Sequence, residues 1–217
     1  MDTALMSERI DEGQDRTTIR VLALGGIAFG ALEFAGDLII GPFPRGGTGA
    51  ADLMKYYAGH HSHVATGGTL MAWAAVGLGL FGAGLFGYVR RGAGAALAAV
   101  VLVGTAMAAL SEGISAATYS LLGEMSTDRN LMPAALQAWH VAGAEYGIGA
   151  GMTLLLVGVA AAGILRHAFP VWLAWPALIL AVAQLTPFGF LASLVVLLWC
   201  LVTGAWLAIR PAAGTRS

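Results

Sequence analysis

The sequence predicts an all-α integral membrane protein, a bundle of six transmembrane helices with both termini in the cytoplasm. Hydrophobic residues make up 58% of the 217 residues and charged residues only 11%, and the mean hydropathy is +0.78. Soluble domains carry about 25% charged residues, so this chain lacks the polar surface that a globule needs in water. The net charge of −1 argues against a nucleic-acid partner and leaves the lipid bilayer as the predicted one.

Six apolar stretches predict the spans, because a helix needs about 20 apolar residues to cross the hydrocarbon core. They are Val21–Ile40, Val64–Val89, Ala95–Leu122, Pro133–Leu165, Phe169–Leu185 and Phe188–Ile209. The fourth is too long for an upright helix and should tilt or project from the membrane, whereas the fifth is at the lower limit of length. Thr186 and Pro187 predict a tight turn between the last two spans, since proline would break a fused helix.

The spans divide the chain into three segments. Residues 1–18 form a polar cytoplasmic segment, residues 19–210 the six-span domain, and residues 211–217 a cytoplasmic tail. The first apolar stretch is longer than the core of a signal peptide and has no clear cleavage site, so we expect it to be retained. The external loop 41–63 begins with an irregular half rich in proline and glycine, and its second half is compatible with a short surface helix.

The distribution of basic residues predicts the orientation. With the amino terminus inside, the cytoplasmic segments hold eight basic residues and the external segments three. The cytoplasmic set is Arg9, Arg16, Arg20, Arg90, Arg91, Arg166, Arg210 and Arg216, and the external set is Arg45, Lys55 and Arg129. This pattern predicts a multi-pass protein of the plasma membrane, and the bias toward alanine, glycine and arginine indicates a bacterial genome.

Polar side chains inside the apolar stretches are the main pointer to function. A charged side chain at the bilayer centre costs about 2.5–3.5 kcal/mol on insertion scales, so it usually faces the bundle interior or a water-filled cavity. The candidates lie in the outer half of the spans or near the midplane, and they are Glu33, Asp37, Glu112, Tyr119, Gln137, His140 and Glu145. We expect them to line an outward-facing acidic vestibule that binds or conducts a small solute or cation.

Two other interpretations remain open. These residues are structural if the protein is an accessory membrane subunit, and they are ligands if it is an intramembrane metalloenzyme. The metal candidates are His140, Glu112, Glu33, His60, His61 and His63. We predict no catalytic residue and no cofactor: haem would need two histidines on facing helices, and the lone Cys200 builds no thiolate site.

Glycines recur at a spacing of four in two of the spans. Gly26 and Gly30 lie on the first span, and Gly143, Gly147 and Gly151 on the fourth. Small residues at this spacing let helix backbones approach closely in lipid. The stripes therefore predict either packing within one bundle or a homo-oligomer interface.

Two segments resemble a group of multi-spanning membrane proteins common in actinobacteria that have no assigned activity. One is Tyr56–Gly68, and the other is the carboxy-terminal hairpin with Phe169–Trp175, Thr186–Leu191 and Leu197–Trp199. They cover about a third of the chain. The resemblance implies a six-span bundle and no functional residue, and the three histidines at 60, 61 and 63 depart from the ordinary polar residues expected there.

Overall fold

The fold is all-α. The computed structural model describes residues 2–42, 44, 48–126, 133–140, 149–186 and 189–209, without the side chains of residues 2–16, 133, 136, 139 and 190. Every regular element in these residues is a helix. The helices are α1 (Asp2–Ile40), α2 (Ala50–Gly92), α3 (Ala95–Met125), α4 (Pro133–His140), α5 (Gly149–Arg166), α6 (Val171–Gln184) and α7 (Gly189–Ile209).

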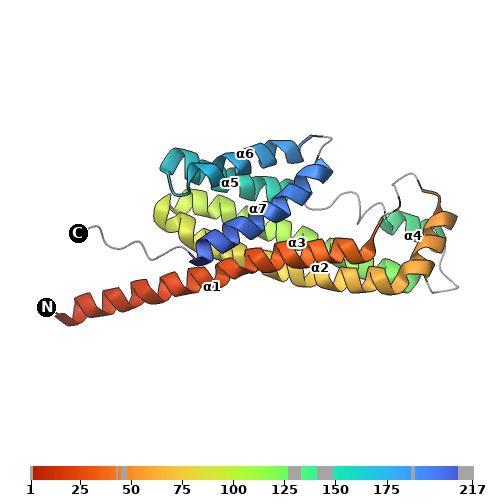
Figure 1. Cartoon of the computed structure of the whole chain (residues 1–217), viewed down its shortest axis with the longest axis horizontal. Coiled ribbons are helices and arrows are strands. Elements are labelled where there is room, and N and C mark those ends of the chain that lie inside the picture. The colour runs from red at the N-terminus through yellow and green to blue at the C-terminus, as the bar shows by residue number, and fades with distance from the viewer. Residues whose placement is uncertain are drawn as a thin grey trace.

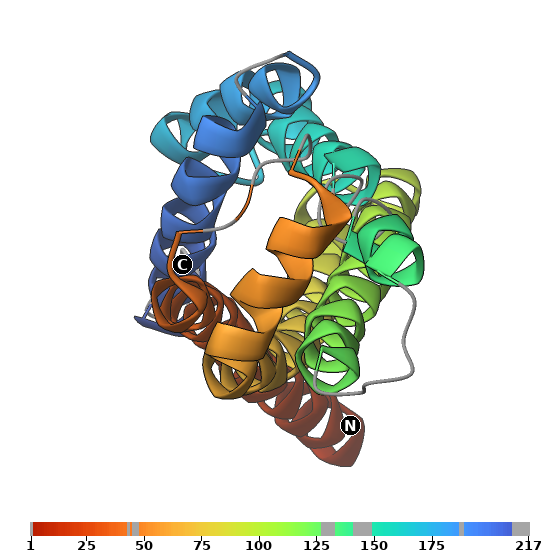
Figure 2. The ribbon, with the colours of Figure 1, turned by 90° about the vertical axis from the view of Figure 1, so that its right-hand side faces the viewer.

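Six of these helices form a closed ring. Each packs on the next in the order α1, α2, α3, α5, α6 and α7, and α7 returns to pack on α1. The short helix α4 lies at one end, against α2 and α3 (Figures 1 and 2). The ring encloses the apolar core and leaves large apolar side chains such as Leu110, Leu165 and Ile179 exposed on its outside.

Five helical segments are long and apolar enough to cross a membrane. They are Thr17–Ile40, Ala50–Gly92, Ala95–Met125, Gly149–Arg166 and Leu191–Ile209. The sixth predicted span, 169–185, contains the apolar helix α6 of only 14 residues. Pro170 caps its start and the helix ends at Gln184. The chain is therefore a helical membrane protein with five candidate spans, and the sixth stays a prediction.

The predicted fourth span is described only in part. A single helix was expected over 133–165; the structure describes helix at 133–140 (α4) and from 149 (α5), and the join at 141–148 lies outside the described residues. α5 alone has 18 residues. At 1.5 Å per residue it spans about 27 Å, close to the thickness of the hydrocarbon core, so it needs no residues from α4.

Helices α1 and α2 extend beyond the predicted spans. α1 continues through the segment predicted as a separate polar region. α2 begins at Ala50, inside the predicted external loop, and kinks at His60, where φ is −123° and ψ is 16°. The helix expected in the second half of this loop is confirmed, and residues 50–58 contain neither the proline nor the glycine that would interrupt it.

The predicted turn between the last two spans is also confirmed. α6 ends at Gln184, α7 begins at Gly189, and the Gly189 amide donates a hydrogen bond of 2.9 Å to the Thr186 carbonyl. The two helices pack against each other. The chain thus reverses direction between Gln184 and Gly189 and returns into the ring.

Glycines allow close helix contacts within the ring. A Cβ added at Gly26 would meet the Phe81 ring and the Cys200 carbonyl, and one at Gly30 would meet the Leu201 side chain. A Cβ at Gly151 would meet the α3 backbone at Ala108. These three glycines serve packing inside one chain, whereas Gly143 and Gly147 lie outside the described residues.

The two ends of the ring have different side chains. One end, called here the aromatic end, is built around Tyr88, Phe169 and Trp206, whose rings contact one another at centroid distances of 4.9–6.1 Å. The other, the polar end, contains the last turns of α1, the start of α2 and α4. All the candidate site residues that the structure describes lie in this half or near the middle.

Candidate functional site

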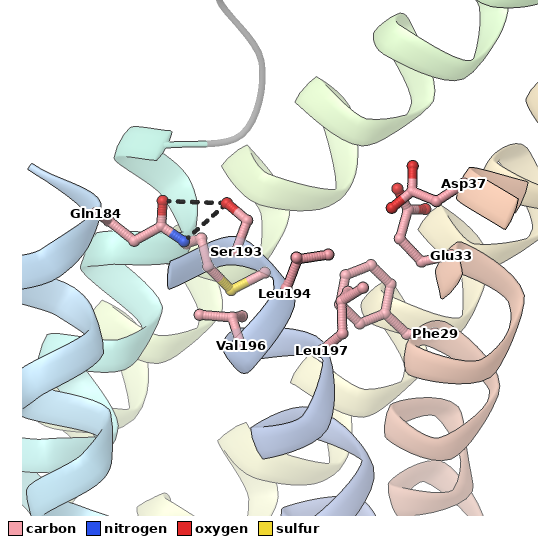
Figure 3. A pocket seen from close by; sticks show the side chains of 9 residues that line it. Phe29, Glu33, Asp37, Gln184, Ser193, Leu194, Val196 and Leu197 are labelled. Carbon is pink, nitrogen blue, oxygen red and sulfur yellow. Dashed lines mark hydrogen bonds between the residues drawn. The ribbon is translucent and has the colours of Figure 1, made fainter. Parts of the chain in front are cut away.

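Two acids of α1 lie in the polar half, one at the surface and one in the interior. Glu33 and Asp37 are one helical turn apart, so their side chains lie on the same face. Glu33 is buried with 7% of its surface exposed, and Asp37 is exposed. Figure 3 shows the two carboxyl groups close together above the Phe29 ring. The spacing predicted this shared face, and the helix of α1 produces it.

Glu112 of α3 places a third carboxyl group next to the Glu33 side chain. It is 1% exposed, and its side chain forms a hydrogen bond with the side chain of Glu33 across the ring. The Oε2 atom of each glutamate is buried and has no hydrogen-bond partner among the described residues. A buried acceptor without a partner costs about 1–3 kcal/mol, so these two atoms call for a ligand, a water or a proton.

A cavity of about 70 Å³ lies beside this carboxyl group pair. It has room for a few water molecules or one small ion. The cavity is lined by Phe29, Glu33, Asp37, Met152, Gln184, Ser193, Leu194, Val196 and Leu197, and Figure 3 shows most of them. Acids therefore form one wall, apolar side chains the base, and an amide and a hydroxyl the opposite wall.

The opposite wall is held together by its own hydrogen bonds. The Gln184 amide nitrogen donates to the Ser193 hydroxyl at 3.2 Å, and that hydroxyl lies 3.4 Å from the Gln184 amide oxygen (Figure 3). Ser193 also donates to the Gly189 carbonyl at 3.1 Å. Oxygen atoms of α6 and α7 thus face acids of α1, and the packing of α6 on α7 sets their positions.

A row of aromatic and imidazole groups continues from the acids toward α4. Tyr119 of α3 interacts electrostatically with the three acids and with Tyr56. Tyr57 is an electrostatic neighbour of Tyr119, is fully buried, and its hydroxyl lies 2.8 Å from the Nδ1 atom of His140. This contact fixes α4 to the start of α2.

The predicted site residues are only partly brought together. Glu33, Asp37, Glu112 and Tyr119 form one cluster, and His140 joins it through Tyr57. Gln137 lies apart, where its amide donates to the Thr48 carbonyl at 3.4 Å. Glu145 lies outside the described residues. Tyr57 and Ser193 were missed as site residues.

A sequence signal existed for Tyr57. With Leu53 and Val64 it forms a spacing of four and seven residues, which is the buried face of a helix. Treating the second half of the loop as an amphipathic helix would have placed Tyr57 inward. Ser193 had no comparable signal, because its position depends on the hairpin between α6 and α7.

The histidines of α2 lie away from this cluster. His60, His61 and His63 are exposed. The His60 ring stacks on Tyr56 at 4.6 Å, its Nδ1 atom lies 2.9 Å from the Tyr56 carbonyl, and the His60 and His63 rings are 6.4 Å apart. Within the described residues, no group of three His, Cys, Asp or Glu side chains is arranged to hold a metal ion.

No protein-family model, curated protein or solved structure matches this chain. The functional interpretation therefore depends on the geometry of the site.

Proposed function

We propose that this chain is a multi-pass protein of a bacterial plasma membrane that binds, and conducts, a small cation at the acid-lined cavity. The observation that carries the proposal is the buried carboxyl group pair of Glu33 and Glu112, each with an Oε2 atom that has no hydrogen-bond partner in the described chain. Intramembrane acids that face a bundle interior or cavity mark ion pathways in membrane proteins.

The chemistry of the cavity wall supports a cation rather than an anion. Its lining residues include two acids and no basic side chain. Oxygen atoms from Gln184 and Ser193 on the other wall are further ligands of the kind that alkali cations accept. The apolar base lowers the polarity around the acids, which strengthens electrostatic attraction within the cavity.

We further propose six crossings, with α6 as the sixth, and cytoplasmic termini. The first turns of the α1 span and the last turns of α7 lie at the aromatic end, because Ile19 packs beside Gly87 and Trp206 beside Tyr88. An even number of crossings is consistent with this arrangement. Basic residues gather at the same end, since α2 ends in Arg90 and Arg91 and α5 in Arg166.

Reporter fusions test this topology. A reporter active only in the cytoplasm should give signal after Arg210, and one active only outside it should give signal after Gly47. The cavity would then open to the outside. The reverse pattern would overturn the proposed orientation.

Cation flux into proteoliposomes tests the function. Vesicles that contain the purified chain should take up Na⁺ or K⁺ faster than empty vesicles. Glu112→Gln should reduce this flux at least tenfold, because the amide keeps the shape of the side chain and removes its charge. Glu124→Gln is the matched control, since Glu124 is an exposed acid on the same helix and should keep wild-type flux.

Two results would favour the other interpretations. If wild-type vesicles show no flux and no cation binding, and both variants fold normally, the acids are structural and an accessory role gains support. If the purified protein retains stoichiometric zinc, iron or manganese that is lost in His140→Ala, the metalloenzyme interpretation gains support.

A further inference from the structure

We infer that the cavity exchanges one proton for one monovalent cation, and that the exchanged proton is the one shared by Glu33 and Glu112. This inference rests on the proposed cation site and adds to it a coupling between cation binding and proton release. It follows from the way in which the two glutamates meet.

Two carboxyl groups form a hydrogen bond with each other only when a proton lies between them. Glu33 of α1 and Glu112 of α3 make such a bond, and both side chains are more than nine-tenths buried. If both carboxyl groups were ionised while in hydrogen-bond contact, they would repel each other strongly in an environment of low polarity. The pair as it stands therefore holds at least one proton, and the form with one proton and one negative charge is the starting state of the exchange that we infer.

A cation at the cavity can replace this proton without changing the net charge. In the proton-bound state, the pair consists of one carboxylic acid and one carboxylate, with a charge of −1. A bound monovalent cation, M⁺, lies between two carboxylates, and the total is again −1. The exchange is Glu–COOH···⁻OOC–Glu + M⁺ → Glu–COO⁻···M⁺···⁻OOC–Glu + H⁺, in which both charge and atoms balance. Binding M⁺ without releasing the proton would place it against a single negative charge and leave the hydrogen bond in its way.

Glu33 lines the cavity, and Glu112 reaches it through its contact with Glu33. The Oε2 atoms of Glu33 and Glu112 are buried and lack hydrogen-bond partners in the described part of the chain. Asp37, one turn beyond Glu33 and exposed, lies between the pair and the surface. It provides a carboxylate that accepts the released proton and passes it to water.

The other ionisable groups near the pair are few. They are Asp37 on α1, Tyr119 on α3, Tyr56 and Tyr57 on α2, and His140 on α4, which reaches the cluster through Tyr57. The cavity residues that α5, α6 and α7 contribute carry no ionisable group. Tyrosines ionise near pH 10, so Asp37 and His140 are the groups that must be separated from the pair experimentally.

Cation titrations at several pH values test the inference. The full-length protein in detergent is titrated with NaCl, and separately with KCl, at pH 6, 7 and 8 and constant ionic strength. Where the pair is protonated, the apparent Kd should fall about tenfold for each unit of pH increase, because one proton leaves for each cation bound. A pH indicator in weakly buffered solution should record one proton released per cation.

Variants assign the proton to the pair. Glu33→Gln and Glu112→Gln keep a hydrogen bond, because the amide donates to the remaining carboxylate, but this bond contains no exchangeable acid. In either variant the proton release should disappear and the Kd should lose its pH dependence. His140→Gln and Glu124→Gln should each still release one proton per cation, and Asp37→Asn should slow this release without changing the number of protons.

A measurement without variants covers the case in which the glutamine variants do not fold. The infrared difference spectrum of the wild-type protein on addition of Na⁺ or K⁺ should show loss of a protonated carboxyl band and gain of carboxylate bands. Tight binding of either cation with a pH-independent Kd and no proton release would overturn the exchange but leave the cation site intact. Loss of proton release in Asp37→Asn or His140→Gln would also overturn it, whereas absence of binding at all three pH values would overturn the proposed function itself.

Discussion

The two halves of the ring are made by the same helices but differ in how their buried polar groups are paired. At the aromatic end, Tyr88 donates a hydrogen bond of 2.8 Å to the Ala168 carbonyl and packs on Phe169 and Trp206. In the polar half, Glu33 and Glu112 are buried with one oxygen atom each left without a hydrogen-bond partner among the described residues. The Tyr88 hydroxyl at the first end thus has a hydrogen-bond partner, whereas one carboxyl oxygen of each buried acid at the second end has none.

The difference shows where stability and function are separated in this protein. Glycines bring the helices together along the whole ring, including Gly67 and Gly68 in the polar half, and this close packing stabilises the fold. The polar half carries buried groups whose desolvation is only partly offset. Groups that lower the stability of the fold are retained at functional sites because activity depends on them.

The largest effect is expected from a glycine in the closely packed part. A Cβ at Gly77 of α2 would lie 2.9 Å from the Phe29 backbone nitrogen and 3.0 Å from the Gly25 carbonyl, whereas one at Gly79 would meet nothing within 4 Å. Gly77→Leu should cost about 3 kcal/mol or more, because the α1 backbone must move. Gly79→Leu is the control. Size-exclusion profiles and thermal unfolding in detergent should show the loss only for Gly77→Leu, and equal profiles would refute close packing of α1 on α2.

The second prediction concerns the stability cost of the acids. The double variant Glu33→Met/Glu112→Met replaces both carboxyl groups by apolar groups of similar size. It should raise the free energy of unfolding by about 1–4 kcal/mol, as replacement of buried charged clusters often does, and should abolish cation flux. Thermal unfolding and vesicle flux measure the two effects. A double variant that unfolds at a lower temperature would show that the acids contribute to the fold.

A tyrosine at each end gives a matched comparison. Tyr57→Phe removes the hydrogen bond to His140, and Tyr88→Phe removes the one to the Ala168 carbonyl. Each should cost about 1 kcal/mol of stability. Only Tyr57→Phe should speed hydrogen exchange in 133–140, because it loosens the contact of α4. Faster exchange there in Tyr88→Phe would mean that the two ends are not independent.

The smallest effect is expected from the exposed histidines. The triple variant His60→Ala/His61→Ala/His63→Ala should change stability by about 0.5 kcal/mol or less, as exposed substitutions usually do, and should leave cation flux unchanged. Flux assays in the presence and absence of a chelator measure this. A large loss of flux in the triple variant would place the histidines in the site.

Much of the fold was predictable because it depends on local chemistry. Apolar length predicted the helices of the membrane protein, and Pro187 predicted the turn between α6 and α7. The boundary errors have physical causes as well. Helices α1 and α2 are longer than the predicted spans. Hydropathy predicts the part of a helix that lies in lipid, but it does not predict where the helix ends.

The sequence by itself determined the class of the protein and one face of the site. The apolar composition and the spacing of four between Glu33 and Asp37 can be read directly from the order of residues and the geometry of a helix. The tertiary structure alone decided which acids meet. Glu112 is far from Glu33 along the chain and reaches it because α1 and α3 both pack on α2. Similarly, only the arrangement of α2 and α4 brings Tyr57 to His140. Contacts between distant segments depend on the packing of whole helices, which no local pattern encodes.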